Sequence, residues 1–223
     1  MTQIQFLLLA AIPILFAITF HEVAHGFVAK LRGDNTAYMM GRLSLNPIKH
    51  IDLIGTIIVP AVLFLMGGFL FGWAKPVPVN EGHLKKPRFD SAIVALAGPI
   101  ANFIMALFWA LVARVAFSLV ARMPEASEIF TYMGYIGVQI NLVLMILNLI
   151  PIPPLDGSRI VSAFLPLHSA IKYNRLERYG FFILLALIII PIGGKPILWY
   201  IMGPFISLFN VMIFSLFGLP HLG

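Results

Sequence analysis

Apolar segments alternate with polar stretches along the chain, and six of them stand out, at roughly 4–29, 53–72, 91–121, 129–150, 179–193 and 196–217. A helix needs about 20 residues to cross a bilayer, and every segment except 179–193 reaches that length. The short segment must tilt or lie in a thin part of the membrane. The pattern predicts an all-α polytopic membrane protein.

The segment 53–72 is the least regular of the six. Pro60 and several glycines weaken a straight helix there. Basic residues flank it on both sides, including Lys49 and Lys75, and basic residues mark cytoplasmic loops. We therefore expect a re-entrant or hairpin-like element near 53–80, with both ends at the same face and its backbone shielded by protein or a wet cavity.

The distribution of basic residues also predicts the orientation. Lys30 and Arg32 follow the first segment, and Lys172 and Arg175 precede the fifth, so these loops should be cytoplasmic. The first apolar run has no basic stretch before it and no small-residue cleavage site after it, which indicates a retained span and not a signal peptide. We expect a multi-pass protein of the cell membrane with the N-terminus outside.

Composition supports this class. Hydrophobic residues make up 60% of the 223 residues and charged residues 11%, whereas a soluble domain carries about 25% charged residues. There is no cysteine, which excludes disulfides, a thiolate nucleophile and thiolate metal ligands. The net charge of +6 is spread over short loops and forms no basic face with interleaved aromatics, so no nucleic-acid partner is expected.

The main candidate for chemistry is a His-Glu-x-x-His sequence at the end of the first apolar run. Residues 1–20 carry no charged side chain, and His21, Glu22 and His25 follow within five positions. On a helix, residues i and i+4 project from one face, so both imidazoles can bind one Zn²⁺ with Glu22 beside them to handle a water. The alternative is a helix end whose polar side chains meet lipid headgroups.

A catalytic zinc site needs a third protein ligand, and Asp156 is the candidate. It follows the fourth segment in a stretch with three prolines and precedes Gly157, which gives the backbone room to approach a ligand. An aspartate here can equally serve as the N-cap of a helix that begins near Ser158. Sequence alone supports both roles, and the need for a third ligand favours the metal.

Two asparagines lie within apolar segments, Asn102 in the third and Asn148 near the end of the fourth. A buried amide must be hydrogen-bonded. Each could join two helices, which is common in membranes, or hold the substrate backbone or a developing oxyanion as a catalytic group.

These residues resemble the site-2 protease family of intramembrane zinc metalloproteases. His21 to His25 is similar to the family's HExxH motif, and Asn148 to Gly157 to its N-x-x-P-x-x-P-x-D-G motif. Two further stretches resemble the family, Ala97-Gly98-Pro99 with Asn102 and Gly41 to Pro47. The four motifs occur in the family's order over roughly 10–160.

The resemblance implies one membrane protease domain over 1–223. The sequence departs from the family in that we find no PDZ or CBS segment in it. Its three-helix catalytic core would lie at about 4–30, 91–121 and 129–166, and its accessory segments at 53–72, 179–193 and 196–217. Asp156 becomes the third zinc ligand and Glu22 the catalytic base. The implied activity is cleavage of the transmembrane segments of membrane proteins, as in regulated intramembrane proteolysis, with the site toward the cytoplasmic side.

Other functions stay open at this point. A zinc-binding transporter would need polar residues across the whole membrane, and they cluster at one face. A scaffold without activity would not need Glu22. The stretch Trp73 to Asn80 alternates prolines with β-formers and predicts an extended edge to which a substrate could add as a strand. The substrate and the oligomeric state, a homo-oligomer included, are not decided by the sequence.

Overall fold

The computed structural model describes residues 3–59, 72 and 74–220, and most of these are helical. The long helices are α1 (Gln3–Leu31), α4 (Pro87–Ser118), α5 (Pro124–Leu149) and α9 (Ile197–Phe217). All four are long and apolar enough to cross a membrane, and they are the only ones in the described part of the chain that meet both conditions. They correspond to the first, third, fourth and sixth predicted segments, so the count of six spans is not confirmed.

The shorter elements connect or cover these helices. They are α2 (Thr36–Met39), η1 (Pro47–His50), the π-helical turn η2 (Leu53–Ile58), η3 (Glu81–His83), α6 (Asp156–Phe164), α7 (Leu167–Asn174), α8 (Glu177–Ile189), β1 (Pro191–Ile192) and β2 (Lys195–Pro196).

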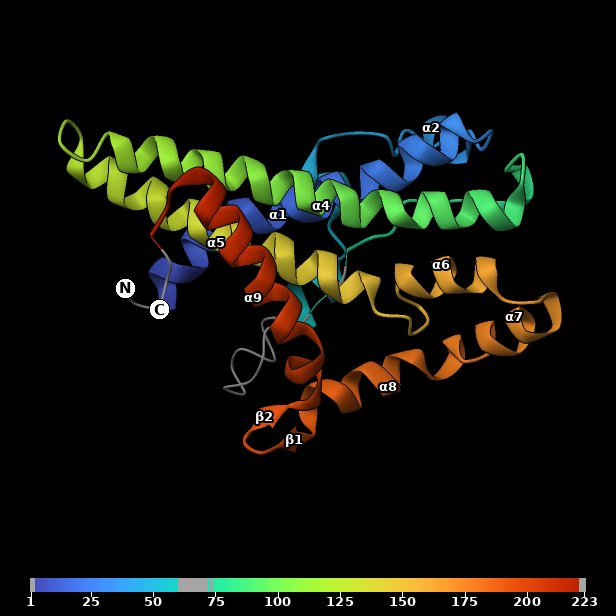
Figure 1. Cartoon of the computed structure of the whole chain (residues 1–223). Coiled ribbons are helices and arrows are strands. Elements are labelled where there is room, and N and C mark those ends of the chain that lie inside the picture. Colours follow the sequence, from blue (N-terminus) through green and yellow to red (C-terminus); the bar gives the residue numbers. More distant parts are fainter. Residues whose placement is uncertain (1–2, 60–71, 73, 221–223) are drawn as a thin grey trace.

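Helices α1, α4 and α5 lie side by side and form the centre of the molecule (Figure 1). The helices α4 and α5 form an antiparallel hairpin that packs through small residues, because Ala106, Ala110 and Ala113 are fully buried. On the facing helix, a Cβ at Gly137 would come within 2.3 Å of the Trp109 ring. A glycine is therefore required there for the two helices to approach this closely.

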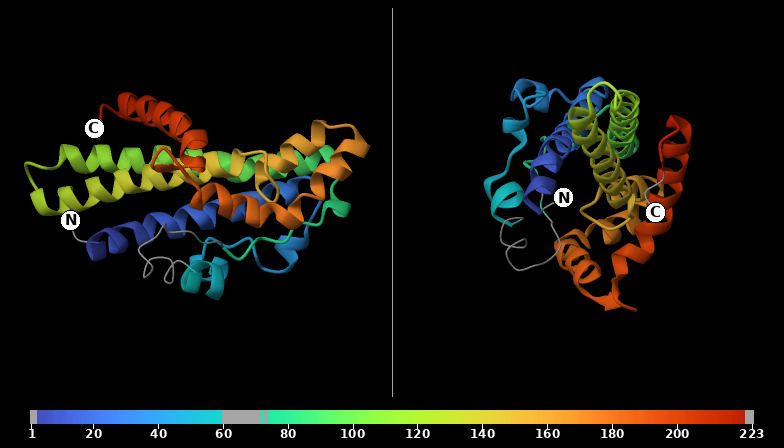
Figure 2. Two further views of the ribbon diagram at one scale, coloured as in Figure 1. Left: turned by 90° about the horizontal axis from the view of Figure 1, so that it is seen from below. Right: turned by 90° about the vertical axis from the view of Figure 1, so that its left-hand side faces the viewer.

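Helix α9 packs against α5 and lies outside the group formed by α1, α4 and α5 (Figure 2). The amides of Gln139 and Asn210 exchange two hydrogen bonds of 2.8 and 3.2 Å. The rings of Tyr135 and Phe214 meet edge to face, with centroids 5.0 Å apart. Polar and aromatic contacts thus join α9 to the core, as expected where lipid provides no hydrophobic drive between helices.

The residues just before and just after the segment predicted as re-entrant lie close together. The Lys75 N–H donates to the His50 carbonyl over 3.0 Å, so the two flanks of this segment meet. The central residues 60–71 lie outside the described part of the chain. The re-entrant element therefore stays a prediction.

Helix α8 has 13 residues, which is too short to cross a bilayer untilted. It leads into a β1–β2 hairpin in which Pro191 pairs with Pro196. The turn uses Gly193 and Gly194, both at positive φ, which glycine adopts without strain. The hairpin connects α8 to α9, so the fifth apolar segment is a short helix beside the bundle.

Candidate metal centre

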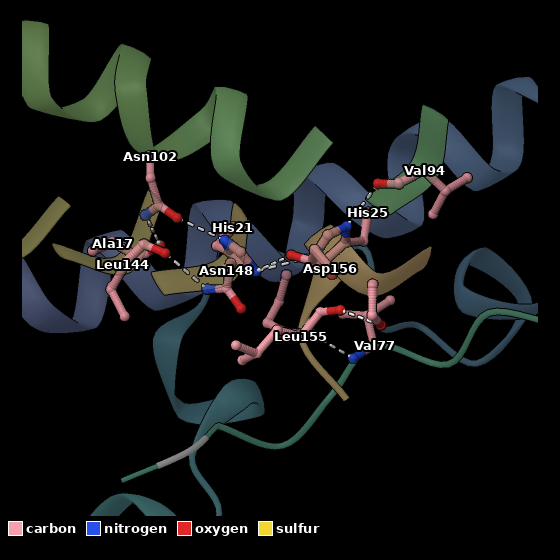
Figure 3. Close-up of polar contacts among 12 residues, drawn as sticks. Ala17, His21, His25, Val77, Val94, Asn102, Leu144, Asn148, Leu155 and Asp156 are labelled. Atoms are coloured by element: carbon pink, nitrogen blue, oxygen red, sulfur yellow. Dashed lines mark hydrogen bonds and ion pairs between the residues drawn. The ribbon is translucent and has the colours of Figure 1, made fainter. Parts of the chain in front are cut away.

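Two histidines from α1 and one aspartate from α6 point toward one another (Figure 3). The Nε2 atoms of His21 and His25 lie 3.0 Å apart. The Oδ2 atom of Asp156 lies 3.3 Å from each of them. Three ligand atoms from residues up to 135 positions apart (156 − 21) are thereby brought to one point.

The spacing of these atoms fits a tetrahedral metal ion. Metal–ligand bonds of about 2.0–2.1 Å at tetrahedral angles place neighbouring ligand atoms about 3.3 Å apart. In addition, the Oδ2 atom of Asp156 is buried and receives no hydrogen bond from the described residues. Buried polar atoms are almost always paired, so this oxygen needs a partner that a metal would provide.

A chain of hydrogen bonds fixes the protonation of His21. The Asn141 Nδ2 donates to the Gly137 carbonyl over 2.8 Å, so its Oδ1 accepts from the Asn102 Nδ2 over 3.1 Å. The same Nδ2 also donates to the Ala17 carbonyl, which leaves the Asn102 Oδ1 to accept from His21 Nδ1 over 2.6 Å. The hydrogen is on Nδ1, and the lone pair of Nε2 is free for a metal.

The second histidine is oriented in the same way by the backbone. His25 Nδ1 lies 2.8 Å from the Val94 carbonyl, which can only accept, so this nitrogen carries the hydrogen. Both Nε2 lone pairs therefore face the Asp156 carboxylate. Three groups that only accept, held within 3.3 Å of one another, call for a cation between them.

Gly98 in α4 makes room for the two imidazoles. A Cβ at this position would lie 2.5 Å from both His21 Cε1 and His25 Nε2. Real Cβ atoms do not approach other atoms this closely, so the close contact between α4 and the histidines requires a glycine. Its place in the Ala97-Gly98-Pro99 sequence thus has a steric reason.

Asp156 reaches the site because the chain turns sharply after α5. It is the first residue of α6, whose N-cap is Leu155, so the alternative in which Asp156 is the N-cap is wrong. A Cβ at Gly157 would lie 2.3 Å from the Leu149 carbonyl oxygen, so glycine lets α6 start directly against the end of α5.

Glu22 does not join the three ligand atoms. Its Oε2 accepts a 2.7 Å hydrogen bond from the backbone N–H of Val77, in the extended stretch between η2 and η3. The other carboxylate oxygen, Oε1, has no hydrogen-bond partner among the described residues. Glu22 is thus held beside the metal site by one oxygen, and within the described part of the chain its other oxygen is open to a water or a substrate.

The two predicted asparagines have different surroundings. Asn102 has no exposed surface, and its amide is fully engaged by His21, Ala17 and Asn141. Asn148 is half-buried and donates to the Leu144 carbonyl of its own helix over 3.0 Å. The contacts of Asn102 favour a positioning role, and the catalytic roles of both residues stay predictions.

Sequence reasoning missed Asn141, which is fully buried and orients Asn102. A signal for it was present, because Asn141 lies seven residues before Asn148 and two helical turns place both on one face. Nothing in the sequence indicated that His25 contacts the Val94 carbonyl or that Glu22 contacts the Val77 N–H. Backbone groups are the same at almost every position, so the sequence does not distinguish them.

The site lies along a helix that is long and apolar enough to cross a membrane. His21 lies ten residues before the end of α1 at Leu31, which at 1.5 Å per residue is about 15 Å from that end. A His-Glu-x-x-His pair on a membrane-spanning helix, completed by a carboxylate from another helix, defines a membrane-embedded metalloprotease.

Comparison with known proteins identifies the family. The chain belongs to peptidase family M50, whose model matches residues 9–133 and 115–191. It is 39% identical over 209 residues, 93% of this chain and 90% of the relative, to a Bacillus subtilis (strain 168) protein named "Putative zinc metalloprotease YwhC". No solved structure matches the chain significantly.

More distant relatives carry similar names. One is "Putative zinc metalloprotease Rip2" of Mycolicibacterium smegmatis, 27% identical over 79% of this chain and 65% of that protein. Another is "Putative zinc metalloprotease MJ0611" of Methanocaldococcus jannaschii, 27% identical over 64% of this chain and 63% of that protein.

Proposed function

We propose that this protein is a zinc-dependent intramembrane endopeptidase that cleaves transmembrane segments of membrane protein substrates, as in regulated intramembrane proteolysis. The observation that carries the proposal is the convergence of His21, His25 and Asp156 on one point beside Glu22. The names of the relatives support zinc as the metal.

The residues have separate roles in this reaction. His21, His25 and Asp156 would hold the metal, and zinc supplies Lewis acidity toward water and the peptide carbonyl when it is bound. Glu22 would accept the proton of the attacking water on Oε1, to which no described residue donates, and return it to the leaving amine. Two histidine ligands, one aspartate ligand and a glutamate base thus cover metal binding and proton transfer.

The asparagines support this chemistry differently. Asn102 keeps the hydrogen of His21 on Nδ1, so that Nε2 stays available as a ligand. Asn148 lies on the same helical face as Asn141, near the end of α5 and shortly before Asp156 in the chain. We assign it the role of hydrogen-bonding the substrate carbonyl or the developing oxyanion.

The depth of the site supports a transmembrane substrate. A site about 15 Å from the end of a helix that is long and apolar enough to cross a membrane suits a peptide bond within the bilayer. A substrate helix must unwind locally there, because its amides are paired. Most basic residues of the chain lie at the end of the bundle that carries α2, α6 and α7, which supports a cytoplasmic position for this end in the cell membrane.

We assign the activity to one domain over 1–223. Helices α1, α4, α5 and α6 make the catalytic core, since they carry the ligands and their hydrogen-bond partners. Helices α8 and α9 are accessory. The oligomeric state does not enter this assignment, because all three ligand atoms come from one chain.

Replacing Glu22 with Gln tests the proposal. The variant should keep its zinc but lose cleavage of single-pass transmembrane test proteins in liposomes by about 10²- to 10⁴-fold, as expected for loss of a general base. The matched control is Glu128→Gln, an exposed acid at the start of α5, which should cleave normally.

The same pair of variants separates other functions. A zinc transporter would keep most of its flux in Glu22→Gln, and a scaffold would keep its binding. Cleavage at the wild-type rate by Glu22→Gln would contradict the proposal.

A further inference from the structure

We infer that the backbone N–H of Val77 is a positioning group for Glu22 and that the segment 74–80 is clamped in place to provide it. The inference rests on the proposed role of Glu22 as the base. It concerns a backbone donor that lies 55 residues away in the chain from the carboxylate it holds.

The sequence around Val77 leaves one backbone N–H that can donate to Glu22. Pro76 and Pro78 have no N–H, so Val77 is the only donor in 76–78. A residue before a proline is confined to extended conformations, which keeps the backbone of Val77 straight. Its N–H donates to Glu22 Oε2 over 2.7 Å, within the range of a strong charge-assisted bond.

The surface of α1 is shaped to receive this segment. Gly26 lies four residues after Glu22, on the same helical face. A Cβ at Gly26 would come within 2.7 Å of Val77 Cγ1 and 2.5 Å of Leu43 Cδ2. Glycine therefore allows Val77 to lie directly on α1, where only 7% of its surface is exposed.

One end of the segment is held by Arg42. Its Nη2 donates to the carbonyls of Lys75 and Pro76 over 2.9 and 3.3 Å. Its Nη1 donates to the Lys49 carbonyl over 2.7 Å. One guanidinium thus ties the backbone immediately before Val77 to the chain around η1.

The other end is held by Asp34, which is fully buried. Its Oδ2 accepts from the Asn80 N–H over 2.7 Å, and its Oδ1 accepts from the N–H of Thr36 over 3.0 Å. Asp34 therefore joins the end of the segment to the start of α2. With Arg42 at 75–76 and Asp34 at 80, the amide between them has a fixed position.

This arrangement has a direct consequence for proton transfer. A glutamate side chain rotates about three bonds, and a base must lie within hydrogen-bond reach of the proton it takes. Because Val77 holds Oε2, the carboxylate is restrained in one orientation, and Oε1, to which no other described residue donates, is the oxygen that would accept the proton.

Hydrogen exchange tests the contact without any substrate. Because two prolines flank Val77, exchange within 76–78 comes from this amide alone. In the full-length protein, exchange should be roughly tenfold or more faster in Glu22→Ala than in wild type. In Glu22→Gln it should be slower than in Glu22→Ala, since the side-chain amide still offers an oxygen. Equal exchange in all three proteins would overturn the inference.

Cleavage kinetics test the role of the contact. Val77→Pro removes the N–H and keeps an extended backbone, so kcat should fall by about 100-fold with unchanged KM and zinc content, as expected when a catalytic group is displaced. The control is Val79→Pro, which adds the same ring where the N–H has no hydrogen-bond partner among the described residues. This variant should keep its kcat.

The outcomes separate this inference from the proposed function. Loss of turnover in Glu22→Gln together with a wild-type kcat in Val77→Pro overturns the positioning role alone. An equal loss in Val79→Pro and Val77→Pro also overturns it, because the shape of the segment and not the N–H would then matter. Retained turnover in Glu22→Gln overturns the proposed function itself.

Discussion

Small residues matter to this site as much as its ligands do. The imidazoles of His21 and His25 fit against α4 only because position 98 has no side chain. Packing in protein interiors is dense, so an added methyl group must displace a neighbour. Here the neighbours are the ligand rings themselves, and their displacement would change the geometry that a metal needs.

Replacing Gly98 with Ala should therefore impair metal binding. The new methyl would lie 2.5 Å from atoms of both imidazoles, and we expect zinc affinity to fall at least about tenfold, as when the surroundings of metal ligands are disturbed. A competition titration with a chelator measures this. The control is Gly203→Ala in α9, whose Cβ would meet Trp199 at an ordinary 3.5 Å. Equal zinc affinity in Gly98→Ala and wild type would contradict the steric account.

The sequence predicted those side chains whose chemistry is visible in local spacing. His21 and His25 are four residues apart on one helix, and this spacing needs no tertiary information. Asp156 was expected as the third ligand, partly through the family resemblance, and the structure brings it within 3.3 Å of both imidazoles. The contact between Val77 and Glu22 could not be predicted, because every residue except proline has a backbone N–H. Only the tertiary path of the chain decides which of these N–H groups lies beside Glu22.

The long helices follow the apolar segments, but two of them begin earlier than their apolar segments do. Helix α4 begins at Pro87, before the predicted 91, and α5 begins at Pro124, before the predicted 129. Both begin with proline in the first turn, where its missing N–H costs nothing. In α4, Asp90 Oδ2 also accepts from the Lys86 N–H over 2.7 Å. First turns are polar because they satisfy free amides, so an apolar pattern places the start too late.

The connection between α1 and α4 depends on one buried carboxylate that should respond to pH. Burial alone would raise the pKa of Asp34, but hydrogen bonds from Thr36, Asn80 and His83 outweigh it and lower the pKa below its ordinary 3.8. A depressed pKa means that the folded state resists protonation. The stabilisation is therefore complete above pH 3.8 and is lost as the pH falls below it, through the folded pKa.

Asp34→Asn should remove this pH dependence. Between pH 5 and about 2, hydrogen exchange at Asn80 should accelerate in wild type as the carboxylate is protonated, while in Asp34→Asn it should follow only the intrinsic exchange rate. Comparing the two proteins cancels the contribution of the other carboxylates. The same pH profile in both would show that Asp34 does not hold this end of the segment.

The molecule as a whole has two unlike ends, which makes its orientation testable. The α4–α5 turn lies at one end of the bundle and α2 at the other (Figure 1). The chain contains no cysteine, so a single introduced thiol reports its own position without background. Val120 in the turn and Met39 in α2 are both exposed.

We expect Val120→Cys to react with a membrane-impermeant maleimide on intact cells, and Met39→Cys to react only after the membrane is opened. The reason is that basic residues gather at the α2 end, which the positive-inside rule places in the cytoplasm. The reverse pattern would place the active site toward the other side of the membrane. Labelling of both on intact cells would mean that the chain crosses the membrane an even number of times between positions 39 and 120, which would contradict a single crossing by α4 with a re-entrant element near 53–80.

The central claim is that His21, His25 and Asp156 bind one metal ion inside the membrane domain. Elemental analysis of the purified protein tests it most directly, with Asp156→Ala as the test variant and Asp52→Ala, which removes only the cap of η2, as the control. We predict about one zinc per chain in wild type and in Asp52→Ala, and substantial loss in Asp156→Ala. Wild-type protein without a transition metal, or an undiminished zinc content in Asp156→Ala, would contradict the account.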